Sequence, residues 1–276
     1  KMNPTDILKF IGIPVAVATG IMLLSWWVLA SKRLQPLGAT IAVGVACLTA
    51  FILQDGVPAF PPTEKWHWLV ITIMLVSLLA CIYPLLKKWD EWIVLQAMIA
   101  GLIGAIVMQF PSQDGIIDRF VVFILILFAC VGLRRLTIPP WHMFLASWMI
   151  LASLSILALQ ASFAKLAFFA GAMSAVAAAL CVLQLVNPRE TKSVQMIFGV
   201  FIVGCALCGI AYDPTHHVPI LAWFLPIICI PLSAIAYFLC KGKYKPVLSL
   251  SIITLFVSGA VVWAILAAPE VDEMWP

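Results

Sequence analysis

The sequence contains very little charge. Only 10% of its 276 residues are Asp, Glu, Lys or Arg, whereas 64% are hydrophobic and the mean hydropathy is +1.13. A soluble domain carries roughly 25% charged residues, and a water-soluble fold of this length could not bury so much apolar surface. The missing charge therefore excludes an ordinary soluble enzyme or binding domain and indicates a protein that is surrounded by lipid.

The sequence also lacks the alternation of apolar and polar residues that a membrane β-barrel requires. Its apolar runs are apolar on every face, as in the stretch 120–133. Only helices and closed barrels satisfy the backbone in lipid. The predicted fold class is therefore all-α, a polytopic transmembrane helical bundle built as consecutive helical hairpins.

The lengths of the apolar runs predict ten transmembrane helices in one integral membrane domain over residues 1–276. Each run is close to the length of about 20 residues that crosses a bilayer core of about 30 Å. The first run is long for a signal peptide, so we interpret it as a retained helix. The predicted spans are 7–30, 36–53, 66–86, 92–110, 116–133, 141–159, 164–186, 194–212, 217–239 and 247–268.

Positive charge collects in every second connection between these spans. Eleven of the sixteen Lys and Arg residues lie in five alternate connections: Lys32, Arg33, Lys87, Lys88, Arg134, Arg135, Arg189, Lys192, Lys241, Lys243 and Lys245. Because basic residues are retained on the cytoplasmic side during insertion, we expect these connections inside. A multi-pass protein of the cell (inner) membrane follows, with both termini on the outer side.

Motifs for catalysis, nucleotide binding and nucleic-acid binding are missing, so we expect no enzyme activity, no cofactor and no nucleic-acid partner. The eight cysteines lie within or at the ends of apolar runs, which favours packing over a disulfide framework. Cys205 and Cys208 form a C-x-x-C inside a span, beside Gly204 and Gly209. A close helix contact is the preferred interpretation, and redox chemistry is the alternative.

The outer connections hold most of the acidic residues and three of the four histidines. We expect the acidic side chains to be solvated, with a basic partner or cations as the alternative. His67, His216 and His217 lie on this side near Asp213, where a metal or haem site is conceivable. Interfacial histidines bonded to water and headgroups are the preferred interpretation, so no metal is expected.

Charged residues are also missing from the middle of the spans, where they usually mark transport pathways. Lys9 and Lys165 lie near the outer interface, where we expect them to extend to the headgroups. The polar groups at mid-depth are hydroxyls that can bond within their own helix or to a neighbour, namely Thr72, Ser77, Ser153, Ser155 and Ser174.

Two helices carry patterns that could serve function. Ala167, Gly171, Ala175 and Ala179 form a small-residue ridge at four-residue spacing, which suits close helix packing either inside the bundle or with another subunit.

The ninth span contains Pro226 and Pro231 in its interior, with Ser233 close by. We expect a kink there, and the alternative is a broken helix that lines a substrate cavity.

The loop Gly56-Val57-Pro58-Ala59-Phe60-Pro61-Pro62 before Trp66 resembles uncharacterised multi-hairpin membrane proteins of planctomycete-type bacteria, a resemblance that implies no activity. Ten spans in under 300 residues is similar to the drug/metabolite transporter superfamily. That superfamily implies cytoplasmic termini and inverted halves, and this chain departs from both.

Two functions therefore remain. The first is a non-catalytic scaffold subunit that has protein partners in a larger membrane complex. The second is a small-solute transporter that uses the ninth helix.

Overall fold

The computed structural model describes residues 4–29, 34–57, 60–62, 64–82, 92–108, 115–137, 139–189, 191, 193–213, 217–240, 242 and 244–267, without the side chains of 4–7. These residues form ten helices and no strand. The helices are α1 (Pro4–Val28), α2 (Gln35–Asp55), α3 (His67–Ile82), α4 (Ile93–Val107), α5 (Ile116–Arg135), α6 (Pro140–Gln160), α7 (Ala164–Val186), α8 (Val194–Tyr212), α9 (Ile220–Leu239) and α10 (Lys245–Ala267).

The predicted all-α bundle is confirmed, and each predicted span overlaps one of these helices. Eight helices are long and apolar enough to cross a membrane. The described parts of α3 and α4 are shorter, with 16 and 15 residues. At 1.5 Å per residue they measure about 24 and 22 Å, less than the bilayer core of about 30 Å.

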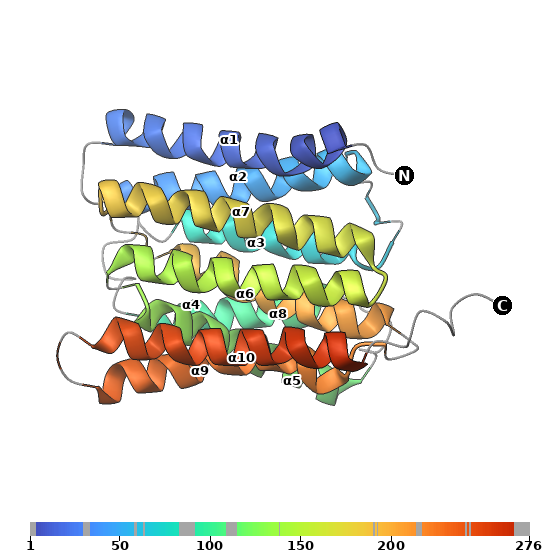
Figure 1. The fold of residues 1–276 in the computed structure, drawn as a ribbon. Helices are drawn as coiled ribbons and strands as arrows, with labels where there is room; N and C mark the ends of the chain where they lie inside the picture. Colours follow the sequence, from blue (N-terminus) through green and yellow to red (C-terminus); the bar gives the residue numbers. More distant parts are fainter. Residues whose placement is uncertain are drawn as a thin grey trace.

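The ten helices lie side by side, and successive helices run in opposite directions (Figure 1). The beginning of α1 and the end of α10 therefore lie at the same end of the bundle. We call this the terminal end. The opposite end, which we call the basic end, carries Arg134, Arg135, Arg189 and Lys245 among the described residues.

The centre of the bundle is α8. Every residue from Val194 to Ala206 is buried, and α8 packs against α2, α3, α4, α5, α6 and α9. The outermost helices are α1, which packs on α2 and α7, and α10, which packs on α9 and α6. Because its surroundings are protein on all sides, α8 needs no polar face.

Three glycines explain how so many helices can approach α8. Gly199, Gly204 and Gly209 are five residues apart, and at 3.6 residues per turn this spacing rotates each by about 140° from the last. A Cβ on Gly199 would lie 2.6 Å from the Cys130 Sγ of α5, and a Cβ on Gly209 would overlap the Trp223 ring of α9. The third glycine faces α3 in the same way. The small residues beside the C-x-x-C are thus points of close helix contact.

The hydroxyl groups inside the spans bond in both of the expected ways. Thr72, Ser77 and Ser153 donate to carbonyls of their own helices at 2.7 Å. Ser155 of α6 donates to the Ala167 carbonyl of α7 at 2.7 Å, and Ser174 of α7 donates to the Trp148 carbonyl of α6 at 3.1 Å. The latter two bonds tie α6 to α7 in both directions.

Candidate functional site: a polar cluster at the terminal end

Four charged or titratable side chains meet at the terminal end of the bundle. Asp55 is the last residue of α2, Glu64 lies in the connection to α3, His67 begins α3, and Lys165 lies in the first turn of α7. The short connection between α2 and α3 brings the first three together. The turn between α6 and α7 brings Lys165 to them. We call these four residues the polar cluster.

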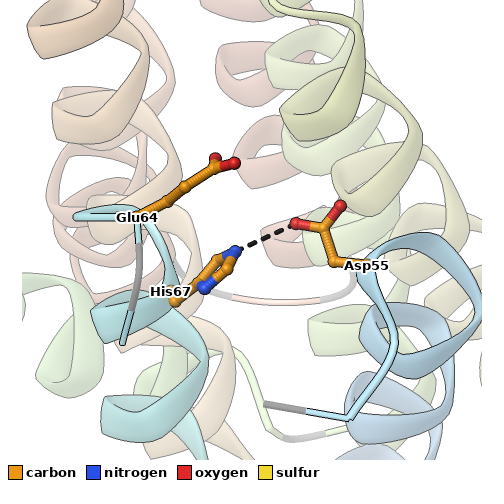
Figure 2. A group of neighbouring side chains, drawn as sticks. All are labelled: Asp55, Glu64 and His67. Atoms are coloured by element: carbon orange, nitrogen blue, oxygen red, sulfur yellow. Dashed lines mark hydrogen bonds and ion pairs between the residues drawn. The ribbon is translucent and has the colours of Figure 1, made fainter. Parts of the chain in front are cut away.

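Every carboxylate oxygen of the cluster has a partner. The Asp55 Oδ2 lies 2.9 Å from the His67 Nε2, and the Asp55 Oδ1 lies 3.1 Å from the Lys165 Nζ. The Lys165 Nζ also donates to the Glu64 Oε1 at 3.1 Å, and the Trp66 indole Nε1 donates to the Glu64 Oε2 at 2.6 Å. One ammonium group therefore bridges two carboxylates. Figure 2 shows His67 and Asp55 facing each other from α3 and α2.

Buried aromatic rings pack against the side of this network that faces the interior of the bundle. Trp66 is fully buried, and its ring lies 4.8 Å from the His67 ring and 5.4 Å from the Phe51 ring between centroids. The Lys165 ammonium lies 5.9 Å from the centre of the Trp66 ring, within reach of a cation–π attraction. The backbone N–H of Trp66 donates to the Tyr212 hydroxyl at the end of α8. The cluster thus links α2, α3, α7 and the central helix.

Burial divides the cluster into an inner and an outer half. The side chains of Asp55 and His67 are each 9% exposed, whereas those of Lys165 and Glu64 are 44% and 45% exposed. Partial burial raises the pKa of Glu64, but hydrogen bonds from Lys165 and Trp66 outweigh it, so this pKa lies below its ordinary value. The folded state therefore favours the charged form of Glu64.

The cluster has ligand atoms for a metal ion. One atom each of Asp55, Glu64 and His67 lie within 4.8 Å of one another. The Lys165 ammonium, however, already contacts both carboxylates, and the other His67 ring nitrogen faces away from them (Figure 2). A divalent cation would have to displace Lys165 and the Trp66 indole. The described geometry fits an ion-pair network better than a metal site.

The sequence prediction missed this cluster. Lys165 was expected to extend to the headgroups, and Asp55 and Glu64 were expected to be solvated, yet the three are paired with one another. Trp66, whose indole donates to Glu64, is fully buried beside them. One signal was present, because an aspartate and a histidine flank the same short connection.

The remaining predicted histidines lie elsewhere or outside the described residues. The His217 Nδ1 lies 3.5 Å from the Asp213 Oδ1, and its backbone N–H donates to the same oxygen at 3.1 Å. This carboxylate holds the turn between α8 and α9. His216 lies outside the described residues.

The small-residue ridge faces helices of the same chain. Ala167 is buried, and a Cβ on Gly171 would lie 3.1 Å from the Ser155 Oγ of α6. Ala175 and Ala179 lie further along α7 and are half-buried. Because α7 packs closely on α6 and α1, the described contacts place at least the first half of the ridge inside the bundle.

The ninth helix is continuous. The structure runs α9 from Ile220 to Leu239 through Pro226 and Pro231, so the broken helix considered from the sequence is not what the structure has. Pro226 is buried, and the fully buried Ser233 donates its hydroxyl to the Ile230 carbonyl at 2.8 Å. Pro231 borders a groove of about 370 Å³ on the outside of the bundle.

The C-x-x-C cysteines are also inside the protein. Cys205 and Cys208 are both fully buried on α8 and are free thiols. Redox exchange needs an accessible thiolate, and this environment offers none. Packing against neighbouring helices accounts for their position.

A comparison of the chain with models of known protein families and with curated proteins finds no match. The class of protein, a multi-pass helical membrane protein, therefore follows from its own residues.

Proposed function

We propose that this protein is a non-catalytic scaffold subunit that holds other components of a larger membrane assembly. The observation that carries the proposal is the packed interior around α8. Two fully buried aromatic pairs fill the space between α6, α7 and α8, with ring centroids 6.0 Å apart for Phe144–Phe198 and 5.0 Å apart for Phe169–Phe201.

The polar chemistry of the cluster supports the same function. Its carboxylates are already bonded to Lys165, His67 and Trp66. A catalytic acid or base must reach a substrate proton, and these groups reach one another. The cluster is therefore suited to fixing the shape of the terminal end.

The periphery offers large apolar surfaces. Trp27 on α1 is 87% exposed, and Leu255 and Leu266 on α10 are 70% and 79% exposed. These helices are the outermost ones, so lipid or partner helices would cover them. The alternation of basic connections supports placing both termini on the outer face of the cell membrane.

The test is to extract the tagged chain with its lipids and to determine its mass in native mass spectrometry. We expect the chain to carry partner proteins in a fixed ratio. A mock extraction from untagged cells is the control. A bare chain in every preparation would contradict the proposal.

A second measurement addresses the transporter alternative. Purified chain in sealed vesicles is expected to carry small neutral solutes no faster than empty vesicles do. Solute flux that Ser233→Ala or Pro231→Ala abolishes would favour the transporter and contradict the scaffold.

A further inference from the structure

The basic end of the bundle contains a cavity of about 500 Å³ where α5 ends, α9 ends and α10 begins. Its polar lining consists of Arg134, Arg135, Thr137, Tyr237 and Lys245. None of the eight described residues that line it is acidic. We call this cavity the basic pocket. Arg134 already has another interaction partner, so Arg135 and Lys245 are the two cations of this cavity that favour an anionic occupant.

Lys245 and Arg135 are the cations that can bind a phosphate group in this cavity. The Lys245 Nζ lies 5.6 Å from the centre of the Tyr237 ring, which holds the ammonium at the cavity wall. Arg135 is exposed to the cavity mouth, and Arg134 is 8% exposed. Guanidinium groups bind phosphate oxygens through paired hydrogen bonds, and the Thr137 hydroxyl at the same wall donates to the Arg134 carbonyl at 2.7 Å.

Two apolar grooves extend from this pocket along the outside of the bundle. The first, of about 370 Å³, lies between α5 and α9 and is lined by Phe128, Pro231 and Ile235. The second, of about 490 Å³, lies between α4 and α5 and is lined mainly by apolar residues of α4. Arg135 borders the pocket and both grooves. The grooves thus diverge from one cationic residue on either side of α5.

A close helix crossing shapes the first groove. A Cβ on Gly132 of α5 would lie 2.6 Å from the Ile230 Cγ2 and 3.3 Å from the Ile230 carbonyl carbon of α9. The two backbones therefore meet at Gly132, and Pro231 follows directly on α9. The groove runs along this crossing and opens toward the surrounding lipid.

We propose that the basic pocket and its two grooves bind one diacyl phospholipid with an anionic headgroup. Its phosphate lies between Arg135 and Lys245, and one acyl chain lies in each groove. A free phosphate would use the pocket but neither groove. A zwitterionic lipid would use the grooves and leave the cations with less compensating charge. Basic pockets between helices at a membrane surface bind anionic headgroups in this way.

The test is a titration of the delipidated protein, in detergent, followed by native mass spectrometry. The probes are phosphatidylglycerol, phosphatidylcholine of the same acyl chains, and inorganic phosphate. We expect phosphatidylglycerol to bind in a ratio of one to one and more tightly than the other two. With each cation near a headgroup contributing about 1 kcal/mol, Arg135→Gln should weaken binding about fivefold and Arg135→Gln with Lys245→Gln roughly 25-fold.

Arg119→Gln is the matched control, because Arg119 is an exposed arginine at the other end of the same helix. It should leave the affinity unchanged. Ile235→Trp fills the first groove and changes no charge. It should weaken the binding of phosphatidylglycerol and leave the binding of inorganic phosphate unaltered. The melting temperature of each variant verifies the fold.

Three results would overturn the proposal. Equal affinity for phosphatidylcholine would remove the role of the cations. An equal loss in Arg119→Gln would reduce the effect to general electrostatics. Full competition by inorganic phosphate together with an unaffected Ile235→Trp variant would show an anion site without acyl-chain grooves.

Discussion

The central position of α8 can be tested by adding a single methyl group to it. Gly199→Ala places a Cβ 2.6 Å from the Cys130 Sγ and 3.1 Å from the Cys130 backbone nitrogen of α5. Rotation about the Cα–Cβ bond of Cys130 can move the sulfur away, but the backbone of a packed helix cannot move in this way. Gly20 on α1 is the matched control, because a Cβ there would have nothing within 4 Å.

The magnitude follows from two opposing effects. Overpacking a well-packed site costs about 1–3 kcal/mol. Replacing glycine by alanine in a helix gains about 1 kcal/mol at both positions. The gain cancels in the comparison, so Gly199→Ala should be less stable than Gly20→Ala by about 1–3 kcal/mol. At ~2–4 °C per kcal/mol, this difference lowers the melting temperature by roughly 2–12 °C.

The assay is thermal unfolding in detergent, followed by the intrinsic fluorescence of the eleven tryptophans. A second variant removes one contact at its source, because Cys130→Ala deletes the sulfur that the new methyl group meets. The double variant should recover part of the loss caused by Gly199→Ala, since the backbone contact persists. Equal melting temperatures for the Gly199 and Gly20 variants would refute the placement of α8 against α5.

Three further predictions concern the polar cluster and the orientation. Lys165→Met leaves the 9% exposed Asp55 with His67 as its remaining partner among the described residues. Because Lys165 is itself 44% exposed, we expect thermal unfolding to show a loss of about 1–3 kcal/mol, against less than about 0.5 kcal/mol for Lys65→Met at an exposed lysine of the same end. Because the folded-state pKa of Glu64 is lowered, its stabilisation is present above its unfolded pKa of about 4.3 and is lost as the pH falls through the folded pKa. The stability difference between the wild type and Glu64→Gln should therefore shrink between about pH 6 and about pH 3, and a difference independent of pH would contradict the ion pair. In intact cells, an impermeant maleimide should label Lys65→Cys and spare Tyr244→Cys, and the reverse pattern would invert the proposed orientation.

The helices could be predicted from the sequence because each depends on local composition. The segment Val194–Tyr212 is apolar in composition, and it can form a helix whether lipid or protein surrounds it. For the same reason apolar composition alone could not identify α8 as the central helix. Its mean apolar character does not distinguish it from the peripheral α10. The spacing of Gly199, Gly204 and Gly209 around the whole helix was the distinguishing signal.

The polar cluster could not be predicted because it depends on contacts between distant residues. Lys165 is separated from Asp55 by 110 residues, and four apolar helices, α3 to α6, lie between the two along the chain. The sequence of these helices does not specify which of them pack together. A lysine one turn inside a span has two physical options, extension to the headgroups or pairing with an acid. Only the packing of α7 beside α2 decides between them.

Among the described residues, the two ends of the bundle differ in how their charges are compensated. At the terminal end the protein supplies both signs, so Lys165 is held by Asp55 and Glu64 at any lipid composition. At the basic end Arg135 and Lys245 line a pocket that has no acidic residue among its described lining residues, and the lipid proposed above would supply the compensating charge there. Basic residues kept at this end by insertion would then also bind the anionic lipid. We therefore expect anionic lipid to raise the stability of the protein through the basic end. We expect pH to change its stability through Glu64 at the terminal end.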